Sequence, residues 1–370
     1  QDAIKALPEV TVLGTAEEAW KQALGVSTIT AEDLERRPPA NDLSEIIRTT
    51  PGVNLTGNST SGQRGNNRQI DLRGMGPENT LILIDGKPAS SRNAVRYGWR
   101  GERDSRGDSN WVAPELVESI EVLRGPAAAR YGNGAAGGVV NIITKKGAKE
   151  THGQVSLYAN APEHSDEGAT QRLNFSLSGP LAEDFSYRLT GNSNETGADG
   201  KNINAGKQAP GYASVLPAGR EGVRNQDVGA QLSWRLLPGH TLDLDLSYGR
   251  QGNIYTGDTQ NVGSNAVVEA KRGTETNILT KRNLALTHKG KFDFGNTMSY
   301  LQYGETEIAR IQEGLVGGTE GIFLAGTPPF VTSLLQDVSA HSEVNIPLSG
   351  TWNQMLTAGV EWTGQKLQDP

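Results

Sequence analysis

The chain has 370 residues, which allow two or more domains, and a net charge of −7 at pH 7. This acidic balance argues against a nucleic-acid-binding protein, because such proteins carry a basic surface. The chain contains no cysteine, so a disulfide framework and a thiolate metal site are both excluded. Its five histidines are scattered without H-x-x-x-H spacing, which argues against a zinc site.

The apolar runs of the chain are short. Leu81–Ile84 is one of the longest, and it falls far below the roughly 20 residues of a membrane helix. A transmembrane β-strand needs only about 10 residues of alternating polarity, so a β-barrel stays open. The 46 glycines favour turns, loops and β-structure over helix packing. No signal peptide is present at Gln1. For an exported protein, we expect the residue numbering to begin after removal of the signal peptide.

Residues 1–24 contain few apolar anchors and predict a mobile arm. Within this arm, Pro8–Leu13 is a short β-prone segment flanked by polar residues. Taken alone, the segment is an ordinary linker strand or part of a disordered tail.

Residues 25–150 predict a compact α+β domain. Val26–Thr30 predicts a strand, and its last residue forms a candidate capping box with Asp33. Asn41 is expected to cap a second helix, Asp42–Thr49, which must end before the Pro-Gly pair that follows. Further predicted elements are strands at Gln69–Leu72 and Thr80–Ile84, a turn at Asp85-Gly86 and a short helix that begins at Pro114.

The stretch Glu121–Lys146 combines a strand, a helical turn, a glycine-rich turn and a second strand. The first strand, Glu121–Leu123, must stop at Pro126, because proline cannot donate to a ladder. Pro126 suits the first position of a short helix over Ala127–Arg130. Four glycines then allow a sharp turn, and Val139–Thr144 resumes a strand. No residue pattern in this stretch indicates catalysis.

The same stretch contains LRGP, RYG, GG and NIITK in this order. It resembles the signature of the plug domain in TonB-dependent outer-membrane receptors, and the match is long and highly specific. The resemblance implies that the arm carries a TonB box, an extended peptide that a periplasmic partner captures by strand addition. The implied TonB-binding residues are Pro8, Glu9, Val10, Thr11, Val12 and Leu13.

After residue 150 the sequence changes to alternation. Every second residue of Arg172–Ser178 is apolar, and Asp184–Thr190 repeats the pattern after a tight turn at Gly179–Glu183. The pattern recurs at 228–234 and 242–248, and further turns are expected at Leu237–His240, near His288–Lys291 and near Pro347–Gly350. Such alternation predicts antiparallel strands with one apolar face.

The other connections are long and span about Asn192–Asn225, Gln251–Leu279 and Glu305–Leu335. Short turns at one end and long polar loops at the other are typical of an outer-membrane barrel. A soluble sandwich, the alternative, would carry more charge on its polar face. The predicted fold is therefore an α+β plug domain inside a transmembrane antiparallel β-barrel. We place the arm at 1–24, the plug at 25–150 and about nine barrel strands at 151–370.

The predicted plug is too large for a barrel of nine strands. A domain of about 125 residues has a radius of gyration of roughly 14 Å. A barrel of eight or nine strands holds only its own side chains, whereas about 22 strands enclose a plug. The chain therefore predicts the first part of a barrel, which we do not expect to close alone.

The segment Ser91–Trp111 gathers five arginines and three aromatic residues. Three acidic residues offset part of this charge, so a solvated loop with internal ion pairs is the plain alternative. A ferric tris-catecholate carries three negative charges on an aromatic shell, and a guanidinium can pair with its oxygens and stack on its rings. A second polar loop, Gln63–Arg68, is expected beside this segment. The candidate siderophore-binding residues of the plug are Arg64, Arg68, Arg92, Arg96, Tyr97, Trp99, Arg100, Arg103 and Arg106.

The segments at 59–88 and 90–108, with DTQN at 258–261 and EGLVGGTEG at 313–321, resemble the branch of this family that imports ferric enterobactin. The resemblance implies siderophore-binding groups on barrel loops at Tyr255, Lys281, Arg310, Gly317 and Gly318. Lys281 departs from the family's arginine, which weakens the case for bidentate pairing there. The paired glycines would open backbone N–H groups to an anion, although a flexible loop tip explains them equally well.

The resemblance implies a TonB-dependent importer of a ferric catecholate, with ferric enterobactin as the favoured cargo, in the outer membrane of a Gram-negative bacterium. Iron would stay ligated by the siderophore, so we expect no protein metal site, no cofactor and no enzymatic activity. The implied partners are TonB with its inner-membrane energising complex and outer-membrane lipid, and no nucleic acid. Two alternatives stay open: another siderophore, cobalamin or glycan on the same fold, and a non-transporting adhesin or passive porin.

Overall fold

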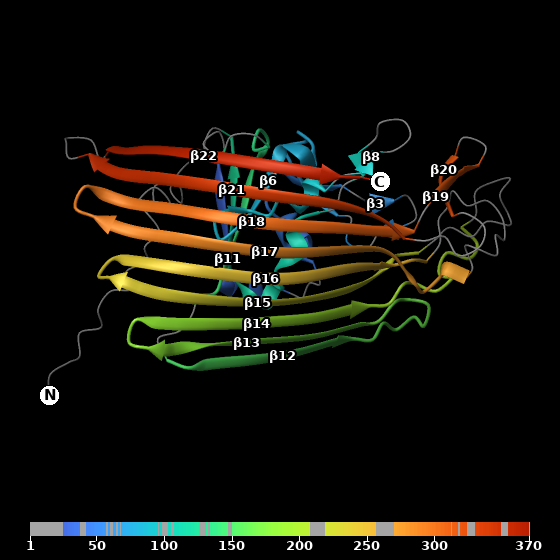
Figure 1. Cartoon of the computed structure of the whole chain (residues 1–370). Coiled ribbons are helices and arrows are strands. Elements are labelled where there is room, and N and C mark those ends of the chain that lie inside the picture. The colour runs from blue at the N-terminus through green and yellow to red at the C-terminus, as the bar shows by residue number, and fades with distance from the viewer. Residues whose placement is uncertain are drawn as a thin grey trace.

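The computed structural model shows two groups of strands that lie against each other (Figure 1). The described residues are 25–37, 42–56, 58–59, 62–63, 66, 68–94, 96–97, 103–104, 107–125, 131, 134–146, 150–207, 219–256, 270–311, 313–316, 319–323, 330–348 and 354–369. The segment Pro8–Leu13 and the predicted helical turn at Ala127–Arg130 lie outside these ranges.

The predicted plug contains a five-stranded sheet in the order β1-β10-β11-β6-β7. β11 and β6 pair in parallel, and the other neighbours are antiparallel. Three two-stranded pairs, β2-β5, β3-β4 and β8-β9, accompany this sheet. The strands are β1 (Val26–Thr30), β2 (Val53–Thr56), β3 (Asn58–Ser59), β4 (Gly62–Gln63), β5 (Gln69–Leu72), β6 (Thr80–Ile84), β7 (Lys87–Pro88), β8 (Arg96–Tyr97), β9 (Arg103–Asp104), β10 (Val117–Arg124) and β11 (Gly138–Thr144).

The first helix, α2 (Ala31–Arg36), confirms the predicted capping box. The backbone N–H of Asp33 donates to Thr30 Oγ1 at 3.2 Å, and the backbone N–H of Thr30 donates to Asp33 Oδ2 at 3.0 Å. The backbone and then the hydroxyl of Thr30 lower the pKa of Asp33 through these hydrogen bonds. Among the described residues, 3₁₀ helices lie at Pro77–Asn79, Ser91–Asn93, Ser109–Trp111 and Pro114–Leu116, and the last of these confirms the prediction at Pro114.

The second helix, α3 (Leu43–Ile47), is shorter than predicted and has a different cap. Its N-cap is Asp42, whose Oδ1 accepts the Ser44 N–H at 2.7 Å, so the prediction of Asn41 was wrong. Asp42 has the extended backbone that an N-cap needs, which makes Leu43 the first helical residue. The helix also ends two residues before Thr49, and turns follow it.

The core of the plug lies on β11 and its neighbours. Every residue of β11 is buried, as expected for a strand that is covered on both faces. Ile120 on β10 and Ile142 on β11 are completely buried in one cluster with Leu43 and Ile47 of α3. The helix therefore covers part of the sheet, and the two elements hold each other by apolar contact.

The second group of strands, called the wall below, is one antiparallel sheet of nine strands. Each strand pairs with the next along the chain, except that β18 pairs with β21. The strands are β12 (His152–Asn160), β13 (Thr170–Ala182), β14 (Phe185–Thr196), β15 (Gly222–Leu237), β16 (His240–Ile254), β17 (Glu275–Phe292), β18 (Gly295–Ile311), β21 (Phe330–Leu348) and β22 (Gln354–Gln368). The hairpin β19 (Glu313–Val316) and β20 (Thr319–Phe323) lies in the connection before β21. The limits of arm, plug and barrel stay predictions.

The predicted alternation is confirmed in β13, and β18 shows the same alternation of exposed and buried residues. In β13, Leu173 and Phe175 are 45% and 43% exposed, whereas Arg172 and Asn174 are buried at 4% and 3%. The polar residues therefore face the plug, and the apolar residues face away from it. This arrangement is the reverse of a soluble protein and is typical of a barrel wall with an aqueous lumen.

Two predicted turns lie at slightly different positions. β13 continues to Ala182, so its turn is shorter than Gly179–Glu183. β17 continues to Phe292, beyond the turn expected near His288–Lys291. In both cases the strands pair up to the turn, because each added pair satisfies further backbone groups.

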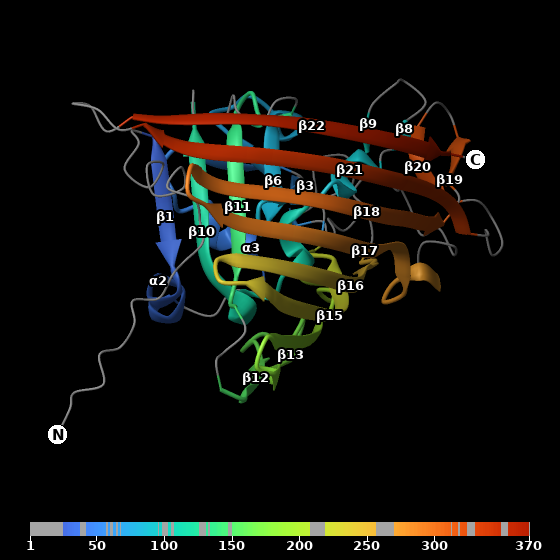
Figure 2. The same ribbon diagram turned by 60° about the vertical axis from the view of Figure 1, so that its left-hand side comes forward.

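The sheets cross each other rather than stack in register. Figure 2 shows β1, β10, β11 and β6 running across the direction of the wall strands, on the concave side of the wall. The long connections gather at one end of the wall, and the short turns lie at the other (Figure 1). Among the described residues, no helix is long and apolar enough to cross a membrane.

Gly138 tests the packing of the plug. It has φ +147°, and a Cβ there would lie 2.4 Å from the carbonyl oxygen of Leu123 and 2.5 Å from Leu72 Cδ1. We expect Gly138→Ala to lower the free energy of unfolding of the plug by about 2–4 kcal/mol. Gly74 has φ +70° with nothing within 4 Å of its Cβ position, so Gly74→Ala should lose only about 1 kcal/mol. Calorimetry on the full-length protein checks both, and equal losses would contradict the steric account.

Candidate functional site

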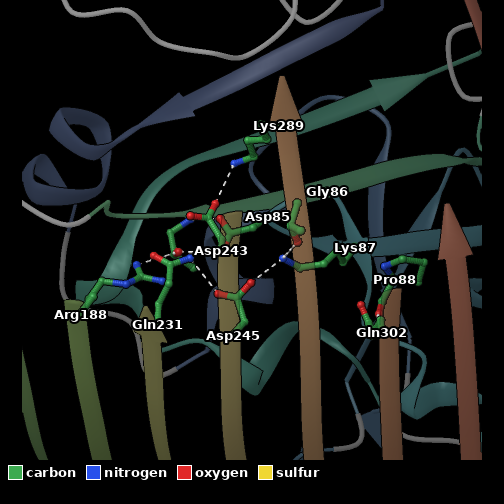
Figure 3. A network of polar contacts seen from close by, with 12 residues as sticks. Asp85, Gly86, Lys87, Pro88, Arg188, Gln231, Asp243, Asp245, Lys289 and Gln302 are labelled. Atoms are coloured by element: carbon green, nitrogen blue, oxygen red, sulfur yellow. Dashed lines mark hydrogen bonds and ion pairs between the residues drawn. The ribbon is translucent and has the colours of Figure 1, made fainter. Parts of the chain in front are cut away.

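The plug meets the wall through the segment Asp85–Ala89, called the docking turn below (Figure 3). Asp85 has φ 50°, and its carboxylate accepts the N–H and the hydroxyl of Thr144, each at 2.8 Å. The Gly86 N–H donates to Asn141 Oδ1 at 3.1 Å. The turn is therefore held on β11 before it contacts the wall, which confirms the predicted turn at Asp85-Gly86.

Lys87 extends from the docking turn into the wall (Figure 3). Its ammonium lies 2.9 Å from Asp245 Oδ2 on β16 and 3.3 Å from Thr287 Oγ1 on β17. Gln231 on β15 donates to the other oxygen of Asp245 at 2.7 Å. Both charged side chains are largely buried, so little water surrounds the pair. Residues of three neighbouring strands, β15, β16 and β17, hold it in place.

The next two residues bind the wall through their carbonyl groups. The Pro88 carbonyl accepts a hydrogen bond from Gln302 Nε2 on β18 at 3.0 Å. The Ala89 carbonyl accepts one from the ammonium of Lys281 on β17. Three successive residues of the turn thus contact β16, β17 and β18, and two of the three contacts use backbone groups that any sequence would present.

Contacts outside the docking turn also hold the plug against the wall. Asn66 is buried and exchanges two hydrogen bonds of 2.9 and 2.8 Å with the side chain of Asn225 on β15. Its backbone N–H donates to Asn253 Oδ1 on β16 at 3.0 Å. Arg172 on β13 forms an ion pair with Glu115 of the plug at 2.5 Å. The plug and the wall are therefore joined by buried polar groups rather than by apolar packing alone.

Arg68, a candidate siderophore residue, is occupied within the plug. It is only 4% exposed and forms an ion pair with Glu45 of α3. Burial lowers its pKa, although a nearby carboxylate, Asp42, acts in the opposite direction. The geometry gives Arg68 a structural role in holding its loop to α3, and its role toward a ligand stays a prediction.

Arg92, a second candidate, joins three segments of the plug. Its guanidinium donates to the carbonyl groups of Pro77 at 2.9 Å, Thr80 and Gly134. Its backbone N–H donates to Asp108 Oδ1 at 3.0 Å. The side chain therefore binds backbone acceptors, as an arginine inside a loop cluster commonly does.

The other plug candidates lie in segments that the structure describes only in part or not at all. Arg96, Tyr97 and Arg103 lie in the short strands β8 and β9, and their side chains are outside the described part of the structure. Arg64, Trp99, Arg100 and Arg106 lie outside it altogether. The predicted gathering of arginines at the plug apex therefore stays a prediction.

Two of the barrel candidates do not lie on loops, contrary to the expectation. Lys281 is inside β17, is 8% exposed and lies with its ammonium 5.4 Å above the ring of Trp111. Arg310 is near the end of β18. Tyr255 does follow a strand but is only 6% exposed. The remaining candidates, Gly317 and Gly318, lie outside the described residues.

The space between plug and wall is lined by both apolar and charged side chains. A cavity of about 150 Å³ is lined by residues of both parts, among them Lys87, Trp111, Arg188, Asp227, Lys281 and Gln302. Within the described ranges, no cluster of histidine and acidic residues could hold a metal ion. The expectation of no protein metal site and no cofactor stays a prediction.

Known proteins resemble this chain in sequence and in fold. Residues 19–139 match the family described as "TonB-dependent Receptor Plug Domain". This part of the chain is therefore similar to a TonB-dependent receptor plug domain. Over 367 residues it is 62% identical to a protein of Pseudomonas aeruginosa named ferric enterobactin receptor, across 98% of this chain and 49% of that protein. It is 60% identical over 364 residues to the ferrienterobactin receptor of Escherichia coli, across 97% of this chain and 49% of that protein.

Solved structures show the same fold. A crystal structure of a ferric enterobactin receptor variant from P. aeruginosa has a TM-score of 0.88 at 62% identity, across 97% of this chain and 51% of that one. The siderophore receptor PirA from Acinetobacter baumannii has a TM-score of 0.87 at 51% identity, across 97% and 50%. The fold is therefore an α+β plug with part of a transmembrane antiparallel β-barrel. The chain spans about half the length of the curated relatives it matches.

The turn at Asp85-Gly86 was predicted from the sequence, but its contacts with the wall were not. Lys87 and Asp245 are 158 positions apart, and neither belongs to a motif that indicates an ion pair. The one available signal was the polar face of the alternating strands, where Asp245 and Gln302 both occur. That pattern shows which residues face the plug but not which plug atom each of them meets.

Lys87→Met tests the docking turn. The variant leaves the Asp245 carboxylate without its cation in a largely buried site, which should weaken plug docking by about 2–4 kcal/mol. Hydrogen exchange in the full-length receptor should then show faster exchange at residues 82–89. Lys289→Met is the matched control, because the ion pair of Lys289 in the described part of the chain is with Asp243 of the wall, at 3.7 Å.

A double variant, Lys87→Met with Asp245→Leu, removes both charges and should recover most of the protection. If Lys289→Met accelerated exchange at 82–89 as much as Lys87→Met, the pair would have no special part in docking.

Proposed function

We propose that this chain serves an outer-membrane receptor that imports a ferric catecholate siderophore, ferric enterobactin, in a TonB-dependent manner. The extracellular loops capture the intact ferric complex and pass it to the arginine-rich apex of the plug. TonB captures the segment Pro8–Leu13 by strand addition and loosens the plug. The siderophore ligates the iron throughout, and the proposal assigns no catalytic step.

One observation carries the proposal. Alignments at about 60% overall identity to proteins named for enterobactin extend over both plug and wall, across 98% and 97% of this chain. A variant of the P. aeruginosa receptor has been solved in complex with enterobactin, and it matches this chain with a TM-score of 0.87 over 95% of its length. Likeness over both parts favours a shared cargo, since the cargo must pass between them.

The geometry supports transport rather than passive diffusion. A plug bound to the inner face of the wall by buried ion pairs and hydrogen bonds obstructs the lumen at rest. Its polar contacts can be exchanged for water, whereas an apolar interface of the same area would resist separation. A plug that is firmly seated and yet separable suits an importer that needs an external source of energy.

The cargo class can be tested by tryptophan fluorescence on the full-length receptor in detergent. Ferric enterobactin should give saturable quenching, because its iron complex absorbs energy near the aromatic residues of the plug. A ferric hydroxamate and cobalamin should give none at the same concentrations. Saturable quenching by the ferric hydroxamate or by cobalamin, or a lack of quenching by ferric enterobactin, would strike out the catecholate assignment and leave the fold unaffected.

The energy coupling can be tested by deletion of Pro8–Leu13 from the full-length receptor. We expect uptake of ferric enterobactin into cells to fall to background, because TonB loses the strand to which it binds. Binding in the fluorescence titration should stay within twofold of wild type, since no loop is changed. Uptake that survived the deletion would show that coupling takes another route.

A further inference from the structure

The end of the wall that carries the long connections is organised around Asp199, which follows β14. Its side chain is buried, and its carboxylate accepts the N–H groups of Gly168 at 3.1 Å and Arg220 at 2.7 Å. The guanidinium of Arg220 donates to the two carboxylate oxygens at 3.2 Å each. Gly168 lies just before β13 and Arg220 just before β15, so one carboxylate joins the ends of three strands.

The backbone of Asp199 extends this connection to β16. Its N–H donates to the Arg220 carbonyl at 2.9 Å, and its carbonyl accepts the hydroxyl of Thr256 at 2.7 Å. Thr256 is 3% exposed and lies two residues after the end of β16. The preceding residue, Tyr255, donates its N–H to the Thr274 carbonyl at 2.9 Å, just before β17. We call Gly168, Asp199, Arg220 and Thr256 the rim knot.

Close backbone packing surrounds the rim knot. A Cβ on Gly168 would lie 1.8 Å from the carbonyl oxygen of Gly197, and one on Gly219 would lie 2.5 Å from Asp199 Cβ. Neither distance is compatible with a side chain, so both positions require glycine. The rim knot is therefore a dense junction of connections and not a loose surface loop.

Asp199 acts in its ionised form. Burial acts to raise its pKa, but the hydrogen bonds from the side chain and the N–H of Arg220 and from Gly168 outweigh this effect, so the net pKa is lowered. All four donors point at an anion. An amide in its place would turn an NH₂ group toward at least one of these donors and would lose the charge that Arg220 faces.

We propose that Asp199 is a positioning residue for ligand capture. This proposal rests on the proposed function, in which an anionic ferric complex enters at the end of the barrel that carries the long connections. Asp199 is buried and fully occupied by its four donors, so it does not touch the ligand. Instead it holds the ends of β13, β14, β15 and β16 in place. Tyr255, a candidate siderophore residue next to Thr256, is held in place with them.

The test is Asp199→Asn in the full-length receptor. We expect the dissociation constant for ferric enterobactin to rise by about tenfold or more, because the variant loses roughly one charged hydrogen-bonded pair. In cells, the ligand concentration for half-maximal uptake should rise in the same proportion, while the maximal rate stays within twofold. A purely structural defect would instead lower the maximal rate, through fewer folded receptors.

Asp184→Asn is the matched control. Asp184 accepts Arg235 Nε at 2.9 Å and Nη2 at 2.7 Å in the turn between β13 and β14, at the opposite end of the wall. It should leave the dissociation constant unchanged. Thr256→Val is a milder variant that keeps the carboxylate and removes one hydrogen bond, so it should shift the constant in the same direction by a smaller factor.

Several results would overturn the proposal. An unchanged dissociation constant in both Asp199→Asn and Thr256→Val would show that the rim knot does not position the binding site. Equal weakening by Asp184→Asn would mean a general loss of barrel stability. A wild-type receptor that failed to bind ferric enterobactin would overturn the proposed function, and this proposal with it.

Discussion

The two-residue period of the β-strand is the constraint on which the rest of this structure depends. Successive side chains of a strand point to opposite faces, so a shift of register by one residue would turn every polar group of a wall strand away from the plug. Arg172 points toward the plug and forms an ion pair with Glu115, whereas its neighbour Leu173 points away from the plug. Continuous pairing across nine strands keeps such positions fixed, and the plug can therefore be recognised by single residues on different strands.

The contacts between plug and wall combine firm seating with the possibility of release. Each buried charge at the docking turn has a partner of opposite charge or a carbonyl group, as Lys87 and Lys281 show. Such pairs contribute little net free energy relative to apolar packing, because desolvation offsets most of the attraction. They do penalise a wrong position strongly, since a displaced plug would leave a buried charge unpaired. The interface therefore fixes the location of the plug more than it increases its stability.

Local features of this fold could be predicted from the sequence, and pairings between distant residues could not. Alternation, the capping box at Thr30 and the turn at Asp85 depend on near neighbours, and the structure confirms them. The choice of Asp42 over Asn41 as helix cap was missed because both residue types cap well and only the backbone angles decide. Arginine content indicated a binding apex, yet sequence cannot show that Arg68 already pairs with Glu45. Charge alone does not separate a ligand group from an internal ion pair.

β16 links the two ends of the molecule that the proposed function requires to communicate. Asp245, near the end with the short turns, holds Lys87, and Asn253 holds Asn66 closer to the long connections. Thr256, just beyond the end of the same strand, donates a hydrogen bond to the carbonyl group of Asp199. β16 is paired over its full length with β15 and β17, so it has little freedom to bend or slide between these points. A change at the rim must then reach the plug as a movement of the paired strands together, or be absorbed in the connections before it reaches β16. The first case would couple capture to the seating of the plug, and the second would keep the plug closed until the external energy source of the proposed function acts.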